Sequence, residues 1–137
     1  MINLNLWLDD YRKPPSFESS GLLWIWVKTA DEAIEALKAG KVQFASLDHD
    51  LAEEHYYAYE HPQDVEDKGF REKTGYEVLV WMRENSVWPV NGVRIHTANS
   101  TRRPIMLSVV HKQYGRWFQH LYVTKSRLDN EDPVDRF

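Results

Sequence analysis

Apolar residues gather in short runs along the chain, and several of these runs end abruptly in polar or charged residues. Residues 3–8 alternate polar and apolar before an acidic pair, which is typical of a strand that opens onto a polar edge. Residues 22–28, 42–47 and 92–99 form further strand-length segments, and residues 120–128 form a last one. The pattern therefore predicts about five strands.

Helical patterns separate the later strands. Thr29 and Glu32 have the spacing of a capping box and precede apolar residues at helical intervals, and Thr74 and Glu77 have the same spacing. Residues 100–115 carry a proline in the first turn of a third predicted helix and end at a glycine. Mostly alternating strands and helices predict an α/β domain with a mostly parallel sheet flanked by helices.

One segment interrupts this alternation. Residues 52–73 are rich in charged and aromatic residues without clear periodicity, which predicts an inserted mobile loop, a lid over or beside a site. The acidic tail, residues 129–137, is expected to fray. With 137 residues and no internal repeat, the chain is expected to form a single domain over residues 1–137.

Composition narrows the classes of function. A formal charge of −4 argues against a surface that tracks extended duplex nucleic acid. The absence of cysteine excludes disulfides, thiolate catalysis and Cys-based metal sites. The N-terminus does not resemble a signal peptide, and no segment approaches the roughly 20 apolar residues of a membrane span. We therefore expect a cytoplasmic protein, whose oligomeric state the sequence leaves open.

Carboxylates follow two of the predicted strands. Asp9 and Asp10 come directly after the first strand, and Asp48 and Asp50 come directly after the third. Aspartate also caps helices and fills turns, but in parallel sheets ligands bind beyond the carboxyl ends of the strands. If the two strands are neighbours, the like charges conflict, and a hard divalent cation removes the conflict. We therefore predict a site for Mg²⁺ or Mn²⁺, formed by Asp9, Asp10 and Asp48.

Two histidines lie at strand ends. His49 stands between the two carboxylates of the third strand end, and in an extended segment it would point away from both, so packing and catalysis are equally compatible with it. His96 is followed by Thr97 and Asn99. A lone histidine is often structural, but an imidazole, a hydroxyl and an amide together are suited to holding an oxyanion.

Arginines near the same strand ends are candidates for binding phosphate. Arg12 follows the first acidic pair and Arg102 follows Asn99 in sequence, and for either one solvated surface charge is the alternative. Core packing is the better interpretation of tryptophans such as Trp7. The stronger candidates for stacking on a base come from the inserted segment: Tyr56, Tyr57 and Tyr59.

The pattern of site residues resembles a receiver domain of two-component signalling. The acidic pair, Asp48 and Thr97 match that family's metal-binding carboxylates, phosphoacceptor and phosphoryl-binding hydroxyl. The family also has a lysine after the fifth strand, which Lys125 alone could match. The resemblance implies a receiver-like, flavodoxin-like fold.

A divergent branch of receivers is more similar still. Four stretches over residues 4–110 resemble the cyclic-phosphate-processing receiver-like family of prokaryotic and phage genomes: "LDDYRKPP", "SLDHDLAE", "TGYEVLVWM" and "RIHTANSTRRPIM". That resemblance implies a role in handling a cyclic nucleotide or cyclic phosphate, in conflict between phage and host. His49, Asp50, His96 and the expanded segment depart from ordinary receivers, and a hydrolase has uses for them that a phosphorelay module lacks.

Three functions stay open at this point. The first is a metal-dependent phosphohydrolase for a cyclic nucleotide or cyclic phosphate, in which Asp48 holds the cation or attacks as a nucleophile and His96 transfers a proton. The second is a signalling receiver phosphorylated on Asp48, and the third is a sponge that binds a cyclic nucleotide without cleaving it. The predicted residues are Asp48, His96, Thr97, Asp50 and His49 for catalysis, Arg12, Asn99 and Arg102 for substrate, and Asp9, Asp10 and Asp48 for metal.

Overall fold

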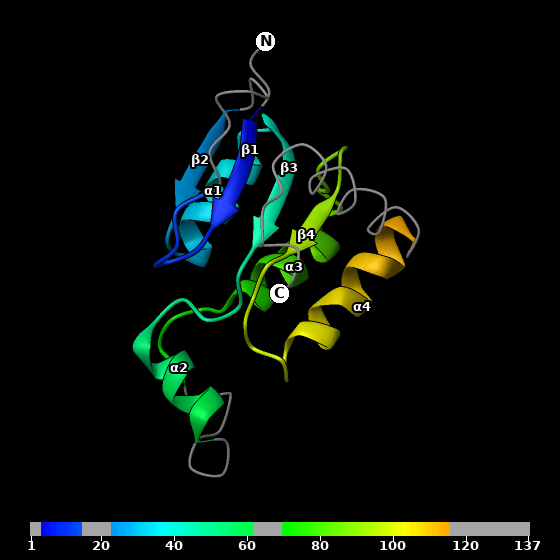
Figure 1. Cartoon of the computed structure of the whole chain (residues 1–137). Helices are drawn as coiled ribbons and strands as arrows, with labels where there is room; N and C mark the ends of the chain where they lie inside the picture. The colour runs from blue at the N-terminus through cyan, green and yellow to red at the C-terminus, as the bar shows by residue number, and fades with distance from the viewer. Residues whose placement is uncertain (1–3, 15–22, 62–69, 116–137) are drawn as a thin grey trace.

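A computed structural model describes residues 4–14, 23–61 and 70–115 of the chain. At its centre is a parallel four-stranded sheet with the order β2-β1-β3-β4 (Figure 1). Its strands are β1 (Leu4–Leu8), β2 (Trp24–Val27), β3 (Val42–Leu47) and β4 (Val93–Ile95). The predicted α/β fold with a parallel sheet is confirmed, with four strands in the described part. The fifth candidate strand, residues 120–128, and the tail, residues 129–137, lie outside the described residues, as does Lys125.

Three of the described helices form a layer on the sheet, and a fourth helix lies apart from it. They are α1 (Ala30–Lys38), α2 (Glu53–Glu60), α3 (Gly75–Asn85) and α4 (Arg103–Tyr114). Helix α3 contacts both α1 and α4, so these three lie side by side. Helix α2 instead lies beyond the carboxyl ends of the strands (Figure 1). No helix in the described ranges is long and apolar enough to cross a membrane.

The buried side chains follow the alternation of the strands. In β1, Leu6 and Leu8 join the main hydrophobic core with Leu79 and Met82 of α3. Trp7 is also buried, at 1% exposure, and its ring meets Trp24 edge to face with centroids 5.7 Å apart. The two faces of β1 therefore have different cores, one aliphatic and one aromatic, and the expected packing role of Trp7 is confirmed.

Two of the helix starts differ from each other in how they are fixed. At α1 the predicted capping box is present, because Thr29 Oγ1 accepts the N–H of Glu32 and Glu32 Oε1 accepts the N–H of Thr29. At α3 the box predicted from Thr74 and Glu77 is wrong, since Thr74 makes no side-chain cap. Close backbone packing fixes this helix instead. Gly75 N–H donates to His49 O at 3.0 Å.

The prediction of a mobile loop over residues 52–73 is wrong for the part that forms α2. His55 is buried at 1% exposure, accepts the N–H of Leu51 at 2.8 Å and bonds the carbonyl oxygen of Glu72 at 2.9 Å. The carboxylate of Glu54 accepts the N–H of Glu72. Only one residue of α2 is buried, so this helix has no amphipathic pattern to read from the sequence.

Candidate functional site

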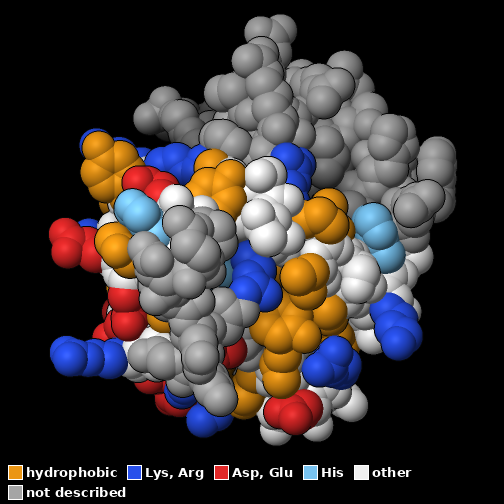
Figure 2. Space-filling view, turned by 90° about the horizontal axis from the view of Figure 1, so that it is seen from below, with side chains coloured by type: hydrophobic (Ala, Val, Ile, Leu, Met, Phe, Trp, Pro, Cys, Tyr) orange, Lys and Arg blue, Asp and Glu red, His pale blue; other side chains and the backbone are white. Residues whose placement is uncertain are grey.

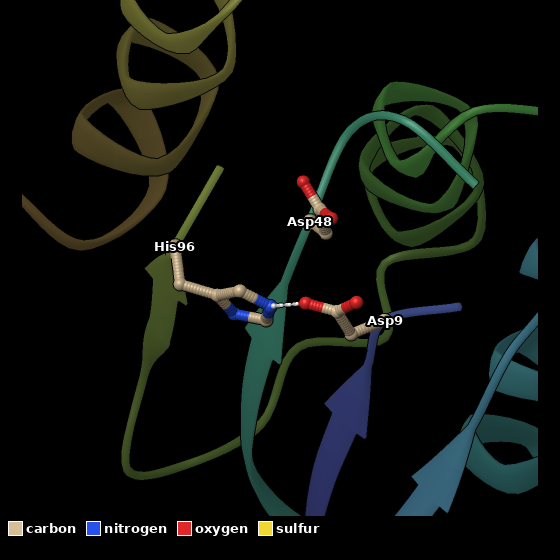
Figure 3. Close-up of side chains that lie close together, drawn as sticks. All are labelled: Asp9, Asp48 and His96. Atoms are coloured by element: carbon tan, nitrogen blue, oxygen red, sulfur yellow. Dashed lines mark hydrogen bonds and ion pairs between the residues drawn. The ribbon is translucent and has the colours of Figure 1, made fainter. Parts of the chain in front are cut away.

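The carboxyl ends of three neighbouring strands bring Asp9, Asp48 and His96 together (Figure 3). The last residues of these strands are aligned in register: Leu8, Leu47 and Ile95. The next residue of each strand therefore reaches the same point, and one ligand atom from each lies within 4.8 Å of the others. We call these three buried residues the acidic cluster. The two acidic strand ends belong to neighbouring strands, which is the condition under which the sequence predicts a conflict of like charges.

Asp9 is saturated with hydrogen bonds. Its Oδ1 accepts the backbone N–H groups of Tyr11 and Arg12, both at 2.8 Å, and its Oδ2 accepts Arg12 Nε at 3.0 Å and His96 Nε2 at 3.1 Å. Burial alone would raise the pKa of Asp9, but the bonds from His96, Arg12 and Tyr11 outweigh it and lower the pKa below 3.8. An ionised carboxylate with four donors has no lone pair left for a cation.

His96 is held at both ring nitrogens. Because a carboxylate only accepts, Nε2 carries the hydrogen and donates to Asp9, and Nδ1 accepts the hydroxyl of Ser46 at 2.7 Å. The ring is fully buried and stacks on Trp7 with a centroid distance of 3.8 Å. Burial lowers the pKa of His96 to about 4, so the imidazole is neutral near pH 7. Contact with a substrate would require one of its two bonds to break.

Asp48 has a contrasting environment. Its Oδ1 accepts the N–H of His49 at 2.7 Å, and its Oδ2 lies 3.6 Å from Arg12 Nη2. Burial first and the charge of Asp9 second raise the pKa of Asp48 to about 7, against the Thr97 hydroxyl and the Arg12 charge. The hydrogen-bond donors and the positive charge around Asp48 therefore do not offset the burial of its negative charge, which we call under-compensated. The backbone here is equally tight, since a Cβ at Gly75 would stand 1.7 Å from Asp48 O.

Arg12, predicted to bind phosphate, connects the members of the cluster. Its Nε bonds Asp9, its Nη2 donates to the carbonyl oxygen of His96 at 2.8 Å, and the same nitrogen faces Asp48. The side chain is 30% exposed, so the guanidinium reaches the surface of the site. The structure thus fixes a positive charge at the open side of the cluster.

Asp10 lies at the rim and is covered by α2. Its Oδ1 accepts the hydroxyl of Tyr56 at 2.6 Å. Partial burial and then the hydrogen bond and charge of Asp10, with the charges of Asp48 and Asp9, raise the pKa of the Tyr56 phenol, which therefore stays protonated. A second tyrosine of α2, Tyr59, bonds Ser100 at 2.9 Å. Sequence reasoning offered these tyrosines for stacking and missed that Tyr56 donates to an acidic rim.

A second polar group joins the loops that follow β3 and β4. His49 Nδ1 lies 2.6 Å from Asp50 Oδ1, so the expectation that His49 points away from both neighbours is wrong for Asp50. Asn99 Nδ2 donates to both oxygens of Asp50, at 3.2 and 3.3 Å, and Asn99 Oδ1 accepts the N–H of Arg102 at 3.0 Å. The polar side-chain atoms of Asp50 and Asn99 are therefore bonded to each other, to His49 and to the backbone.

Two of the predicted residues, His49 and Arg102, line a pocket of about 290 Å³ between the first turns of α3 and α4. We call it the α3–α4 pocket. On the face below the carboxyl ends of the strands, hydrophobic side chains gather beside Lys and Arg side chains (Figure 2). The structure therefore does not bring all the predicted residues to one point, since His49 and Arg102 line this pocket and Asp9, Asp48 and His96 form the acidic cluster. Sequence reasoning proposed none of the hydrophobic residues of the pocket as site residues.

The chemistry of the donors suits a hard divalent cation. Carboxylate oxygens are the ligands that Mg²⁺ and Mn²⁺ prefer. Asp48 carries the under-compensated charge, and half-buried Asp10 follows Asp9 at the same edge. Of the three aspartates predicted as ligands, Asp10 and Asp48 are those whose chemistry suits a cation, whereas Asp9 is committed to Arg12 and His96.

The parallel sheet, with acidic residues beyond its carboxyl edge, defines a receiver-like domain of the flavodoxin type. The chain belongs to the cyclic-phosphate processing receiver domain family, whose model matches residues 4–112. That range contains every residue of the acidic cluster and of the α3–α4 pocket. Comparison with curated proteins and with solved structures gave no significant match.

Proposed function

We propose that the protein is a metal-dependent phosphohydrolase that opens a cyclic phosphate, such as that of a cyclic nucleotide. The observation that carries this proposal is that Asp48 is buried beside Asp9 and His96 at the carboxyl edge of the sheet. One ligand atom of each residue lies within 4.8 Å of the others. Membership of the cyclic-phosphate processing family supports the substrate class. A role in conflict between phage and host stays a prediction.

A cation held by Asp10 and Asp48 would supply polarisation of the phosphoryl group and a lowered pKa for water. Arg12 provides the positive charge for a phosphoryl oxygen, because Asp9 and the carbonyl of His96 hold its guanidinium beside Asp48. Placing a charged donor in advance avoids reorganisation during the reaction. Asp9 is thus a positioning residue in this proposal.

His96 has a second role open to it besides proton transfer. Its hydrogen bonds to Asp9 and Ser46 favour a neutral imidazole that orients Asp9 and, through it, Arg12. We therefore propose His96 as a positioning residue, with general acid–base catalysis as the alternative that the sequence predicts. The two roles differ in their effect on the pH profile.

A second candidate function has one observation in its favour. The Thr97 hydroxyl lies close enough to Asp48 to lower its pKa, as a phosphoryl-binding hydroxyl beside a phosphoacceptor would. In that case Asp48 would accept phosphate and the domain would signal to a partner. Binding of a cyclic nucleotide without cleavage is the third outcome, which the experiment below separates from the other two.

The test is a screen of cyclic mononucleotides, cyclic dinucleotides and a terminal 2′,3′-cyclic phosphate with Mg²⁺ and with Mn²⁺, read by product chromatography. Hydrolysis by the native protein and by Asp31→Asn, but not by Asp48→Asn, supports the proposal. Asp31 is a matched control because its carboxylate is exposed on α1. No turnover of any substrate, with acid-labile phosphate on Asp48 after treatment with acetyl phosphate, would replace the hydrolase by the receiver.

A further inference from the structure

The α3–α4 pocket adjoins the acidic cluster along the chain. His49 follows Asp48 directly and forms part of the pocket wall, while Gly75 packs its backbone against Asp48 O at the start of α3. The volume of the α3–α4 pocket, about 290 Å³, is close to about 300 Å³, the lower end of the range for small-molecule sites. A bicyclic ring fits such a space, but a whole dinucleotide does not.

The walls of the pocket are suited to a flat aromatic ligand. Phe70 and Tyr76 supply aromatic rings, and Ile105 and Met106 supply aliphatic surface. Phe70 also contacts the buried ring of His55, with a centroid distance of 4.7 Å. A mostly apolar pocket with a few polar groups is typical of sites that recognise a planar base by contact and orient it by hydrogen bonds.

Two charged side chains give the pocket its polar character. Glu77, in the first turn of α3, contributes a carboxylate, which can only accept hydrogen bonds. Arg102, at the start of α4, contributes positive charge, and its backbone N–H is fixed by Asn99 at 3.0 Å. The pocket therefore favours a ring with neighbouring N–H donors on one edge, attached to an anionic group.

We infer that the α3–α4 pocket binds the guanine base of a cyclic nucleotide, with Glu77 accepting the N1–H and the exocyclic N2–H of the base. Guanine presents these two donors side by side, whereas adenine presents an acceptor next to its amino group. Arg102 supplies positive charge suited to the phosphate of the same ligand. This inference rests on the proposed function for its substrate class and assigns the base that the function leaves open.

The test measures binding apart from cleavage. Guanosine, adenosine and cyclic GMP are titrated into the Asp48→Asn protein by calorimetry, so that no hydrolysis interferes. Glu77→Gln should weaken the binding of cyclic GMP by ~10-fold or more, since a bidentate pair to a base contributes about 1–3 kcal/mol of discrimination. The same substitution should leave the affinity for adenosine nearly unchanged. Ile105→Trp fills the pocket from an exposed position and should abolish binding of both nucleosides. Val90→Trp, on another exposed apolar residue that does not line the pocket, is the control for the added ring.

The outcomes separate this inference from the proposed function. Hydrolysis of a cyclic phosphate that Ile105→Trp and Glu77→Gln leave unchanged would overturn the guanine pocket and leave the hydrolase intact. Guanosine binding that Ile105→Trp abolishes, without turnover of any cyclic phosphate, would support the pocket and remove the hydrolase. Preference for adenosine over guanosine in the native pocket would overturn the assignment of the base.

Discussion

Asp9 and Asp48 occupy equivalent places at the ends of neighbouring parallel strands, yet their surroundings are opposite. Asp9 accepts four hydrogen bonds, and its pKa is lowered. Asp48 accepts one hydrogen bond, from the backbone N–H of His49, lies beside Asp9, and its pKa is raised to about 7. The comparison teaches that a carboxylate's donors, rather than its position, decide whether it stabilises a site or is available for chemistry.

The largest expected effects come from replacing either aspartate, and the two replacements should change the stability of the protein in different ways. Asp48→Asn should abolish turnover and leave the protein as stable or more stable, since an under-compensated charge is removed. Asp9→Asn should also reduce turnover but should destabilise the protein by about 2–4 kcal/mol, because Arg12 and His96 lose an ionised partner. Urea unfolding in EDTA, beside turnover, measures both. Equal stability changes in the two variants would contradict the comparison.

The pH dependence of stability sharpens the same contrast. The folded pKa of Asp48, about 7, lies above its unfolded value of 3.8. Its contribution to the free energy of unfolding is therefore fully present below pH 3.8 and is lost as the pH rises through 7. The difference of up to about 4 kcal/mol between Asp48→Asn and the native protein should grow from pH 4 to pH 7 and then level off. The measurement is urea unfolding in EDTA across this range, and a flat difference would show that Asp48 titrates normally.

His96→Gln separates positioning from proton transfer. A positioned acid or base contributes about 10²–10⁴-fold, and its loss would remove a limb of the pH–rate profile near pH 6–7. Because both nitrogens of His96 are bonded and its pKa is lowered to about 4, we expect a smaller loss of kcat and an unchanged profile. Loss of a limb near pH 6–7 in the variant would assign His96 to proton transfer instead.

The smallest expected effect concerns the hydrogen bond from Tyr56 of α2 to Asp10. Tyr56→Phe removes the 2.6 Å hydrogen bond to Asp10 Oδ1, and a net hydrogen bond of about 0.5–1.5 kcal/mol corresponds to roughly 2–10-fold tighter binding of Mn²⁺. Calorimetry measures this change. Tyr57→Phe is the matched control, since Tyr57 is exposed on the same helix and stacks on His61. Equal affinities in both variants would mean that Tyr56 does not compete with the cation.

The parts predicted from the sequence are those in which local pattern and buried contacts agree. Asp9 and Asp48 each follow an apolar strand, and parallel strands carry their ligand-binding residues at the same edge, so the sequence predicts an acidic site there, while the pairing of β1 with β3 is known only from the structure. Helix α2 could not be predicted, because it has a single buried residue, His55, and that residue bonds the carbonyl oxygen of Glu72, which is distant in sequence. The α3–α4 pocket was missed for a related reason. Phe70 and Ile105 are 35 positions apart, and no local pattern pairs them.

The most direct test of the account is calorimetric titration of Mg²⁺ and Mn²⁺ into the native protein, Asp10→Asn, Asp48→Asn and the surface control Asp31→Asn. If Asp10 and Asp48 hold the cation, Asp10→Asn and Asp48→Asn should each lose measurable binding while the control keeps it, because each removes a carboxylate ligand. Unchanged affinity in both Asp10→Asn and Asp48→Asn would contradict the metal site, and with it the proposed phosphohydrolase.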